Sequence, residues 1–191
     1  MNGQDIAGFS LVIPDASHEA EYCRVMDRWE ALETNIQPVL MRRYGKNPGE
    51  TVPYAKWLAW CEDDRTTGSM LSTNVPCTLH FLLTPDKEIA GSIVINHSCT
   101  HRGHLHAGVV PWRRGKGYGT IMLRLALSRC LEMGFQTVQI VPRKSNVGAI
   151  RTILRNGGVL LEEFCENGVW SQRYEIGIHG GSAMGGKKPN V

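Results

Sequence analysis

The strongest constraint on how this chain folds is a glycine-rich turn between a short apolar segment and an amphipathic one. Residues 109–120 read Val-Val-Pro-Trp-Arg-Arg-Gly-Lys-Gly-Tyr-Gly-Thr, and Pro111 cannot continue a central strand. Because glycine has no Cβ, such a turn approaches an anion closely, and the N–H groups that begin the next helix attract phosphate oxygens. The turn predicts a strand, an anion cradle and a helix, although a glycine turn without a ligand has the same sequence.

Two better-known phosphate loops do not fit this stretch. The spacing G-x-x-x-x-G-K-[ST] is absent, and a G-x-G-x-x-G turn normally opens a domain and is followed by an acidic residue about 20 positions later. Here the spacing is G-x-G-x-G in mid-chain, and no acidic residue lies near Thr137. The nucleotide-binding folds built on those two loops are therefore excluded.

Charge is divided unevenly along the chain. Residues 1–100 hold 8 Lys/Arg and 13 Asp/Glu, residues 101–191 hold 13 and 5, and residues 89–161 hold ten basic side chains and one acidic one, Glu132. A basic segment of this kind suits a nucleic acid or a phosphorylated cofactor, or it is a solvated surface. No RNP, zinc-finger or helix-turn-helix pattern is present, so we expect no nucleic-acid partner.

Length and composition are those of one folded domain. The chain has 191 residues, 42% hydrophobic and 20% charged, which predicts a single domain over residues 1–176. Residues 177–191 lack apolar periodicity and are expected to form a disordered tail. No apolar run approaches the roughly 20 residues of a membrane span, and the first residues lack a signal-peptide pattern. Six scattered cysteines without a C-x-x-C pair indicate reduced thiols, so we expect a cytoplasmic protein without a membrane partner.

Hydrophobic periodicity predicts strands and helices that alternate in the second half of the chain. Strands are expected at residues 9–13, 78–83, 89–96, 105–110, 137–141, 159–162 and 169–176, with hairpin turns at 84–87 and 166–168. Helices are expected from Asp15 or Ser17 to Leu32, at 54–61, at 117–133 before Gly134, and from Ser145 or Asn146 to Asn156. This order predicts an α/β domain in which a parallel strand pair accompanies antiparallel hairpins.

The glycine turn also carries a family resemblance. Arg114-Gly115-Lys116-Gly117-Tyr118-Gly119 matches the [RQ]-x-x-G-x-[GA] signature of the GNAT superfamily of acyl-CoA N-acyltransferases. The order of elements, Asn146-x-x-Ala149-Ile150 and Gly157-Gly158 also fit, so the resemblance covers roughly Ile6 to Ile176. Through the stretch from Val75 to Phe81, the chain is more narrowly similar to a group of bacterial predicted acetyltransferases. The resemblance implies the GNAT fold, a mixed and mostly antiparallel sheet flanked by helices.

The resemblance further implies acetyl-CoA as cosubstrate and assigns its contacts. Arg114 would add charge near the pyrophosphate, which would lie on the N–H groups of Gly115, Lys116, Gly117, Tyr118, Gly119 and Thr120. The pantetheine would pair with the strand edge at Ala107, Gly108 and Val109, and Asn146 would contact the cofactor arm. The Val109 N–H is then the natural donor to the oxyanion that forms at the thioester carbonyl.

Two features of the family are missing. The position of the tyrosine that protonates the departing thiolate holds Ile153, and residues 89–131 contain no carboxylate to act as base for the amine. Histidine suits proton uptake near neutral pH, and His104 and His106 lie two apart on one strand and so share a face. With His97 and His101 in the preceding loop, the group fits a zinc site, structural roles, or a base or substrate contact from His104 or His106. No metal is expected, because no carboxylate or cysteine pair completes a familiar ligand set.

The resemblance implies an N-acetyltransferase. We expect it to transfer acetyl from acetyl-CoA to a primary amine of a small acceptor by direct attack on the thioester. The alternative is a GNAT-fold protein that binds acyl-CoA as a sensor or scaffold with little turnover, which the missing tyrosine favours. A homodimer is compatible with the sequence. A cationic acceptor is expected if the acidic residues of the N-terminal half bind it rather than forming a solvated surface: Glu30, Glu33, Glu62, Asp63 and Asp64.

Overall fold

Seven strands form one sheet in the order β1-β2-β3-β4-β5-β7-β6. The structure is a computed structural model and describes residues 6–43, 51–68 and 75–178. The strands are β1 (Ser10–Val12), β2 (Cys77–Leu83), β3 (Ile89–Thr100), β4 (Gly103–Val109), β5 (Thr137–Ile140), β6 (Val159–Glu166) and β7 (Val169–Gly177). The hairpins expected at residues 84–87 and 166–168 are confirmed, and both positive φ angles of Asn167 and Gly168 suit a tight hairpin turn.

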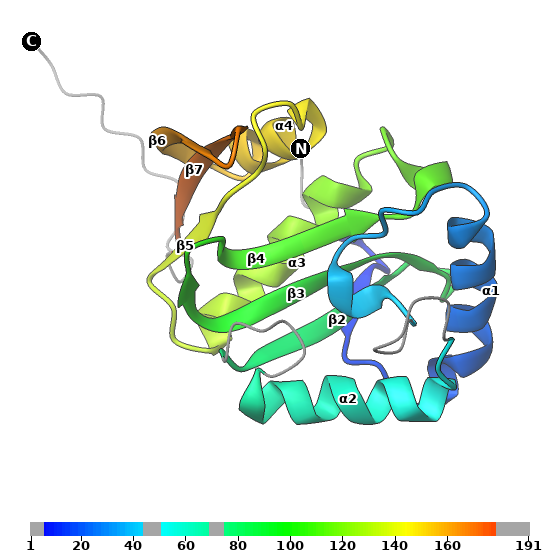
Figure 1. Cartoon of the computed structure of the whole chain (residues 1–191). Helices are drawn as coiled ribbons and strands as arrows, with labels where there is room; N and C mark the ends of the chain where they lie inside the picture. Colours follow the sequence, from blue (N-terminus) through cyan, green and yellow to red (C-terminus); the bar gives the residue numbers. More distant parts are fainter. Residues whose placement is uncertain (1–5, 44–50, 69–74, 179–191) are drawn as a thin grey trace, which may run out of the picture.

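The expected, mostly antiparallel sheet is confirmed, but a parallel pair is missing from it. Every strand pair among the described residues is antiparallel, and β4 and β5 are registered only at Gly103 opposite Ile140. β4 runs away from β5 beyond that pair (Figure 1). The prediction of a parallel partner was wrong, since the single registered pair between these two strands is antiparallel.

Four helices cover the two faces of the sheet. They are α1 (Glu19–Glu30), α2 (Tyr54–Thr67), α3 (Tyr118–Glu132) and α4 (Val147–Arg155). In Figure 1, α3 lies behind the sheet, α1 and α2 lie along its right and lower borders, and α4 accompanies the β6–β7 hairpin. Two apolar cores result, because α1 and α2 pack with one face of β2 and β3 whereas α3 packs with the other.

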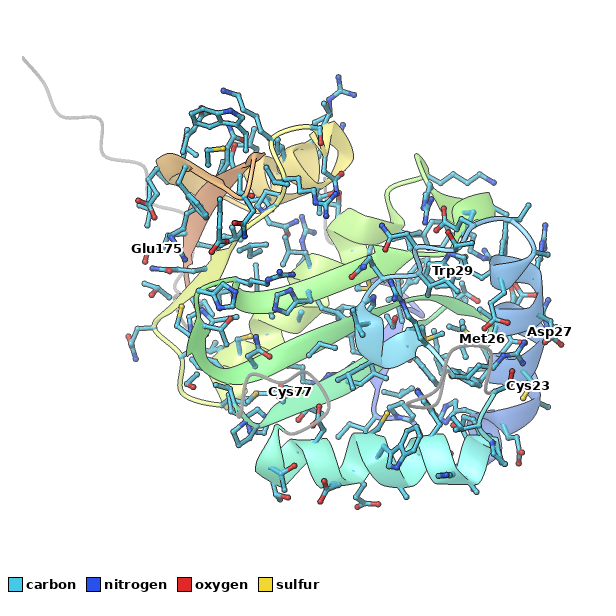
Figure 2. All side chains as sticks on the ribbon, in the orientation of Figure 1. Cys23, Met26, Asp27, Trp29, Cys77 and Glu175 are labelled. Carbon is cyan, nitrogen blue, oxygen red and sulfur yellow. The ribbon has the colours of Figure 1, made fainter. Side chains whose placement is uncertain are left out.

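The first helix shows why its sequence buries one stripe. Asp15 caps the short 3₁₀ turn Ala16–His18 that leads into α1 by accepting from the Ser17 N–H at 2.8 Å. Met26 and Trp29 point from α1 toward the sheet, and Asp27 points away from it (Figure 2). Leu32, expected on the buried face, is 60% exposed because α1 ends at Glu30 and the stripe ends with it.

Several element ends differ from the expected ones. α2 continues to Thr67 and ends at Gly68, whose φ is +66°. β3 runs to Thr100, so His97 lies in a strand and not in the expected loop. Gly177 and Ile178 were assigned to the tail but Gly177 closes β7 and Ile178 is buried, whereas residues 179–191 lie outside the described residues. Among the described helices, none has the length and apolar character needed to cross a membrane.

Candidate active site

A cavity of about 540 Å³ lies where β4 and β5 separate. The start of α3 and the side of α4 close it, and Gln37 of the N-terminal half reaches it. All but one of the expected cofactor-binding residues line the cavity, together with His106. Those lining residues are Ala107, Gly108, Val109, Arg114, Gly115, Gly117, Tyr118, Gly119, Thr120 and Asn146.

The edge of β4 that faces the cavity has backbone groups without a partner strand. The Val110 N–H donates to Ala90 O at 3.0 Å, while Val109 stands opposite Gly91 in the register of β3 and β4. Since alternate residues of an antiparallel strand direct their N–H and C=O groups to opposite sides, Val109 and Ala107 direct theirs away from β3. These groups therefore face the gap between β4 and β5, where an extended ligand could complete the ladder.

The glycine turn forms the second wall of the cavity. Gly115 and Gly117 have φ angles of +76° and +86°, and a Cβ added to either would meet nothing within 4 Å. Among the described residues, the N–H groups of residues 115–119 donate to no acceptor, whereas the Thr120 N–H is used by Gly117 O at 2.9 Å. Open space, free donors and the positive end of the α3 dipole suit a phosphate group.

The charged residues of the turn behave differently from one another. Arg114 donates through Nε to Val109 O at 2.9 Å, and its Nη1 and Nη2 donate to Glu33 at 2.8 and 2.5 Å. Lys116 is the expected cofactor residue that does not line the cavity, and its Nζ lies 3.4 Å from Trp112 O. Tyr118 accepts from Arg113 at its hydroxyl, at 2.9 Å. Arg114 is thus tied to the segment after α1 and to β4, and is less free for a phosphate than its position in the motif suggests.

The helix α4 supplies the third wall, including two basic residues that sequence reasoning missed. Arg151 and Arg155 line the cavity, and neither forms an ion pair within the described residues. Asn146 is the N-cap of α4 and accepts from the Ala149 N–H at 3.0 Å. Ile153 lines the cavity and is buried, and as an isoleucine it offers no hydroxyl at the position where the resembled family has a tyrosine. The four-residue spacing of the arginines was the available signal for a shared face.

His104 and His106 share a strand but have different surroundings. His104 is buried, accepts from the Gln139 N–H at 2.9 Å and packs edge-on against Phe135, and it does not line the cavity. His106 lines the cavity, and its Nε2 lies 3.2 Å from Asn96 Nδ2. Burial lowers the pKa of His104, and burial, with Arg102 nearby, lowers the pKa of His106 to about 4. Both rings are therefore neutral near pH 7, and a titration near pH 6.5 is not expected from His106.

The other two histidines lie away from this site. His97 lies 2.8 Å from the Thr78 hydroxyl through Nε2, and because it follows Asn96 on β3 its side chain points to the opposite face of the sheet. His101 lies in the β3–β4 turn, where its Nε2 accepts from Arg102 at 3.3 Å. Among the described residues, no group of three or more His, Cys, Asp or Glu side chains could hold a metal ion.

The acidic residues expected to bind the acceptor have other partners. Glu30 pairs with Arg43 at 2.7 Å, Glu33 with Arg114, and Glu62 with Arg65 at 3.7 Å. Asp63 accepts from the Thr67 hydroxyl at 3.1 Å, and Asp64 accepts from the Cys77 thiol at 3.2 Å in the core beneath α2. No Asp or Glu is among the described residues that line the cavity. Binding of a cationic acceptor by these five residues therefore stays a prediction, and such an acceptor would have to compete with their present partners.

One side of the cavity is closed by the segment that follows α1. A Cβ added to Gly108 would lie 1.8 Å from Gln37 O, so the backbone of the N-terminal half rests directly on β4. Gln37 lines the cavity, and so does Ile93 of β3 in the same half of the chain. Residue 108 must therefore be glycine for the two halves of the molecule to meet at this point.

Comparison with known families decides the classification of this fold and site. The model of the GNAT acetyltransferase family matches residues 36–157, which is more than half of the chain. The chain belongs to the GNAT family. The matched region of this GNAT protein includes β4, the glycine turn, α3, β5 and α4, which are the elements around the cavity.

Solved structures share the fold of this GNAT protein at low identity. yncA from Salmonella typhimurium, described with its cofactor acetyl-CoA, aligns with a TM-score of 0.59 and 14% identity over 92% of this chain and 97% of that one. RimL, a ribosomal L7/L12 alpha-N-protein acetyltransferase, aligns at 0.61 and 12% over 89% and 93%. A spermidine N-acetyltransferase from Vibrio cholerae aligns at 0.58 and 13% over 90% and 94%. A search of curated proteins gives no significant match.

Proposed function

We propose that this GNAT-family protein transfers the acetyl group of acetyl-CoA to a primary amine of a small acceptor. The observation that carries the proposal is the cavity itself, which joins a phosphate-binding turn to a strand edge without a partner. These two features match the two ends of the cosubstrate, because a pyrophosphate needs N–H donors and an amide-containing arm needs a backbone to pair with. The proposed location of the reaction is the cytoplasm.

The reaction balances with groups of this chain in supporting roles. The acceptor nitrogen bonds to the acetyl carbon, the C–S bond breaks, and one proton passes overall from the nitrogen to the thiolate. Val109 directs its N–H into the gap, where it is placed to stabilise negative charge on the carbonyl oxygen. The turn at residues 115–119 and the guanidinium groups of Arg151 and Arg155 would hold the phosphates. Position 153 holds isoleucine where the family has a tyrosine, and Tyr118, the tyrosine that lines the described part of the cavity, already accepts from Arg113. We therefore propose that water protonates the thiolate.

A cationic acceptor stays a prediction. Spermidine N-acetyltransferases are among the structural neighbours, which favours a polyamine, but the likeness is one of fold. The described lining of the cavity supplies no carboxylate to an ammonium group. The acceptor that suits this lining is an amine held by hydrogen bonds and apolar contacts, and a screen of polyamines, amino sugars, amino acids and peptide amines that measures thiol release would rank these classes.

A second function, binding of acyl-CoA without turnover, is favoured by one observation. Ile153 is buried at the position where the family's proton donor stands. A sensor or scaffold would bind acetyl-CoA through the same turn and would release no CoA with any amine. Release of free CoA that requires both acetyl-CoA and an amine would exclude this second function.

The cofactor site can be tested with two matched glycine variants. Gly117 and Gly157 have φ angles of +86° and +84°, and neither has a neighbour within 4 Å of an added Cβ, but only Gly117 lines the cavity. The backbone strain of Gly117→Leu and Gly157→Leu is therefore similar. We expect calorimetry to show no acetyl-CoA binding by folded Gly117→Leu and unchanged binding by Gly157→Leu. Equal affinity in both variants would contradict the proposed cofactor site.

A further inference from the structure

Asn96, near the end of β3, is the residue that touches the one histidine of the cavity. Its side chain is 1% exposed, and its Nδ2 lies 3.1 Å from Gly103 O and 3.2 Å from His106 Nε2. Its Oδ1 is buried and accepts from no donor among the described residues. A buried amide oxygen without a donor is uncommon. Because Oδ1 has no partner, the two hydrogen bonds of Nδ2 decide how the Asn96 side chain is oriented.

The orientation of the amide fixes the proton on the imidazole. Gly103 O is a carbonyl and only accepts, so the amide atom beside it must be the NH₂ group and not the oxygen. The second hydrogen of that NH₂ group points to His106 Nε2, which must then accept. In a neutral imidazole one nitrogen accepts and the other carries the proton. The proton of His106 is therefore on Nδ1.

The bond from Asn96 to Gly103 O is not needed to hold the β3–β4 turn. The Thr100 hydroxyl also donates to Gly103 O, at 2.8 Å, and Thr100 stands opposite Gly103 in the register. Gly103 O thus accepts from two donors. Among the described residues, the imidazole of His106 is hydrogen-bonded by Asn96 alone. The His106 Nδ1–H has no acceptor among those residues, and the ring lines the cavity.

We propose that Asn96 is a positioning residue that holds His106 in the Nδ1–H tautomer, so that His106 donates a hydrogen bond to an oxygen of the bound substrate and does not act as the base for the amine. The proposal rests on the acetyl transfer proposed above. The lone pair of Nε2 is occupied by the Asn96 amide, so proton uptake there would break the bond that holds the ring. The oxygen that receives the bond belongs to acetyl-CoA or to the amine acceptor, and both sources offer the same acceptor chemistry.

The tautomer can be read in the free protein, without any activity. In the full chain labelled with ¹⁵N-histidine, long-range ¹H–¹⁵N spectra distinguish Nδ1–H from Nε2–H, and the missing signal of His106→Gln assigns the residue. We expect Nδ1–H in the wild type and in Thr100→Val, which removes the other donor to Gly103 O. We expect a change to Nε2–H in Asn96→Asp, because a carboxylate accepts and cannot donate. A wild-type ring protonated on Nε2, or an unchanged ring in Asn96→Asp, would overturn the proposal.

Two substitutions of His106 separate a donor from a base. The side-chain nitrogen of Asn occupies nearly the position of imidazole Nδ1 and that of Gln the position of Nε2, and neither amide accepts a proton near pH 7. With the amine that gives the fastest CoA release, we expect His106→Asn to keep kcat/KM within about 5-fold and His106→Gln to lose about 10²-fold, the scale of one lost oxyanion donor. An equal loss in both variants would favour a base and overturn the donor role.

Ligand titrations identify the source of the oxygen. Addition of CoA and then of acetyl-CoA should shift the His106 Nδ1–H signal while His97, on the opposite face, does not move. A shift with acetyl-CoA but not with CoA assigns the oxygen to the acetyl group, and a shift only after the amine is added assigns it to the acceptor. No shift with any of them overturns the substrate contact. A wild type that releases no CoA with any amine instead contradicts the proposed acetyl transfer and leaves the tautomer result valid.

Discussion

The N-terminal half of this GNAT protein and the α4 wall of its cavity use arginine side chains in opposite ways. In the N-terminal half, Arg43 pairs with Asp27 and Glu30 at 2.5 and 2.7 Å, so acidic residues join α1 to the segment after it. In the C-terminal half, Arg151 and Arg155 face the cavity, and no acidic side chain lines it among the described residues. The difference teaches that a charge imbalance in a sequence locates an anion site only where the charges have no partners within the fold.

The largest effect should come from separating the two halves at Gly108. In Gly108→Ala the new methyl group would lie 1.8 Å from Gln37 O, so the segment after α1 must move away from β4. We expect a loss of about 10²-fold in kcat/KM, the scale of a displacement of about 1 Å in a catalytic site, and about 1 to 3 kcal/mol of stability. Gly148→Ala, where the nearest atom is 3.7 Å away, is the control for stability and should unfold no more easily than the wild type. Wild-type kinetics in Gly108→Ala would show that activity does not depend on this contact between the two halves.

A smaller effect is expected from the unpaired arginines of α4. Arg151→Ala and Arg155→Ala should each raise the Kd of acetyl-CoA about 10-fold, because a hydrogen bond to a charged group contributes about 1.5 to 3 kcal/mol. Arg129→Ala, which removes an arginine paired with Glu132 outside the cavity, should leave the Kd unchanged. Calorimetry with dephospho-CoA, which lacks the 3′-phosphate, would show which arginine contacts that group. The alanine variant of that arginine should bind dephospho-CoA as tightly as the wild type does. Equal Kd values in all three variants would mean that α4 does not bind the cofactor.

The contact between Glu33 and Arg114 joins the two halves and gives a pH-dependent effect. Hydrogen bonds from Arg114 lower the pKa of Glu33 below its usual 4.5. A carboxylate with a lowered folded-state pKa stabilises the fold above its ordinary pKa, and this stability is lost as the pH falls through the lowered value. The difference in unfolding free energy between wild type and Glu33→Gln should therefore shrink from about pH 5 to pH 3, as measured by urea denaturation. The variant also frees Arg114, so its Kd for acetyl-CoA should fall about 2-fold to 3-fold. A higher Kd would show that Arg114 binds the cofactor better when it is paired with Glu33.

The smallest effect is expected at the exposed acidic end of α2. Charge reversal in the double variant Glu62→Lys and Asp63→Lys should change the KM of the amine less than about 2-fold, because exposed charges are screened within about 8 to 10 Å. The same variant should leave the KM of acetyl-CoA unchanged. If the KM of the amine instead rises strongly, and rises further in the wild type with ionic strength, the acidic half does bind a cationic acceptor.

Local signals in the sequence were sufficient for most elements of the fold and for the residues of the glycine turn, whose cofactor role stays a prediction. Asn146 was expected as a helix cap and is one, and Gly134 has the φ of +87° that a residue after a helix requires. The glycine turn is a continuous stretch of chain, so its residues and their chemistry were visible together. Helix ends were less accurate, since α2 continues through Asp63 and Asp64 to Thr67, where burial of Asp64 against Cys77 outweighs weak local propensity.

Contacts between distant segments could not be predicted in the same way. The approach of Gln37 to Gly108 depends on the packing of the segment after α1, and a single glycine on a strand gives no sign of it. The two-residue spacing of His104 and His106 gave no sign that Gln139 would engage His104 while Asn96 engages His106. The lowered pKa values follow from burial, which periodicity alone does not quantify.

The line between β4 and β5, with its single registered pair, is the most weakly paired line of the described sheet. Gly103 opposite Ile140, supported by the bond from the Gln139 N–H to His104, is the connection along this line between β1–β4 and the β5–β7–β6 part. Amide hydrogens of β4 that face the gap should exchange rapidly with solvent in the free protein. A ligand that pairs with this edge takes the place of the missing strand. Its binding therefore stabilises the folded sheet in addition to forming the complex. The cosubstrate would then be a structural element of the sheet during each catalytic cycle.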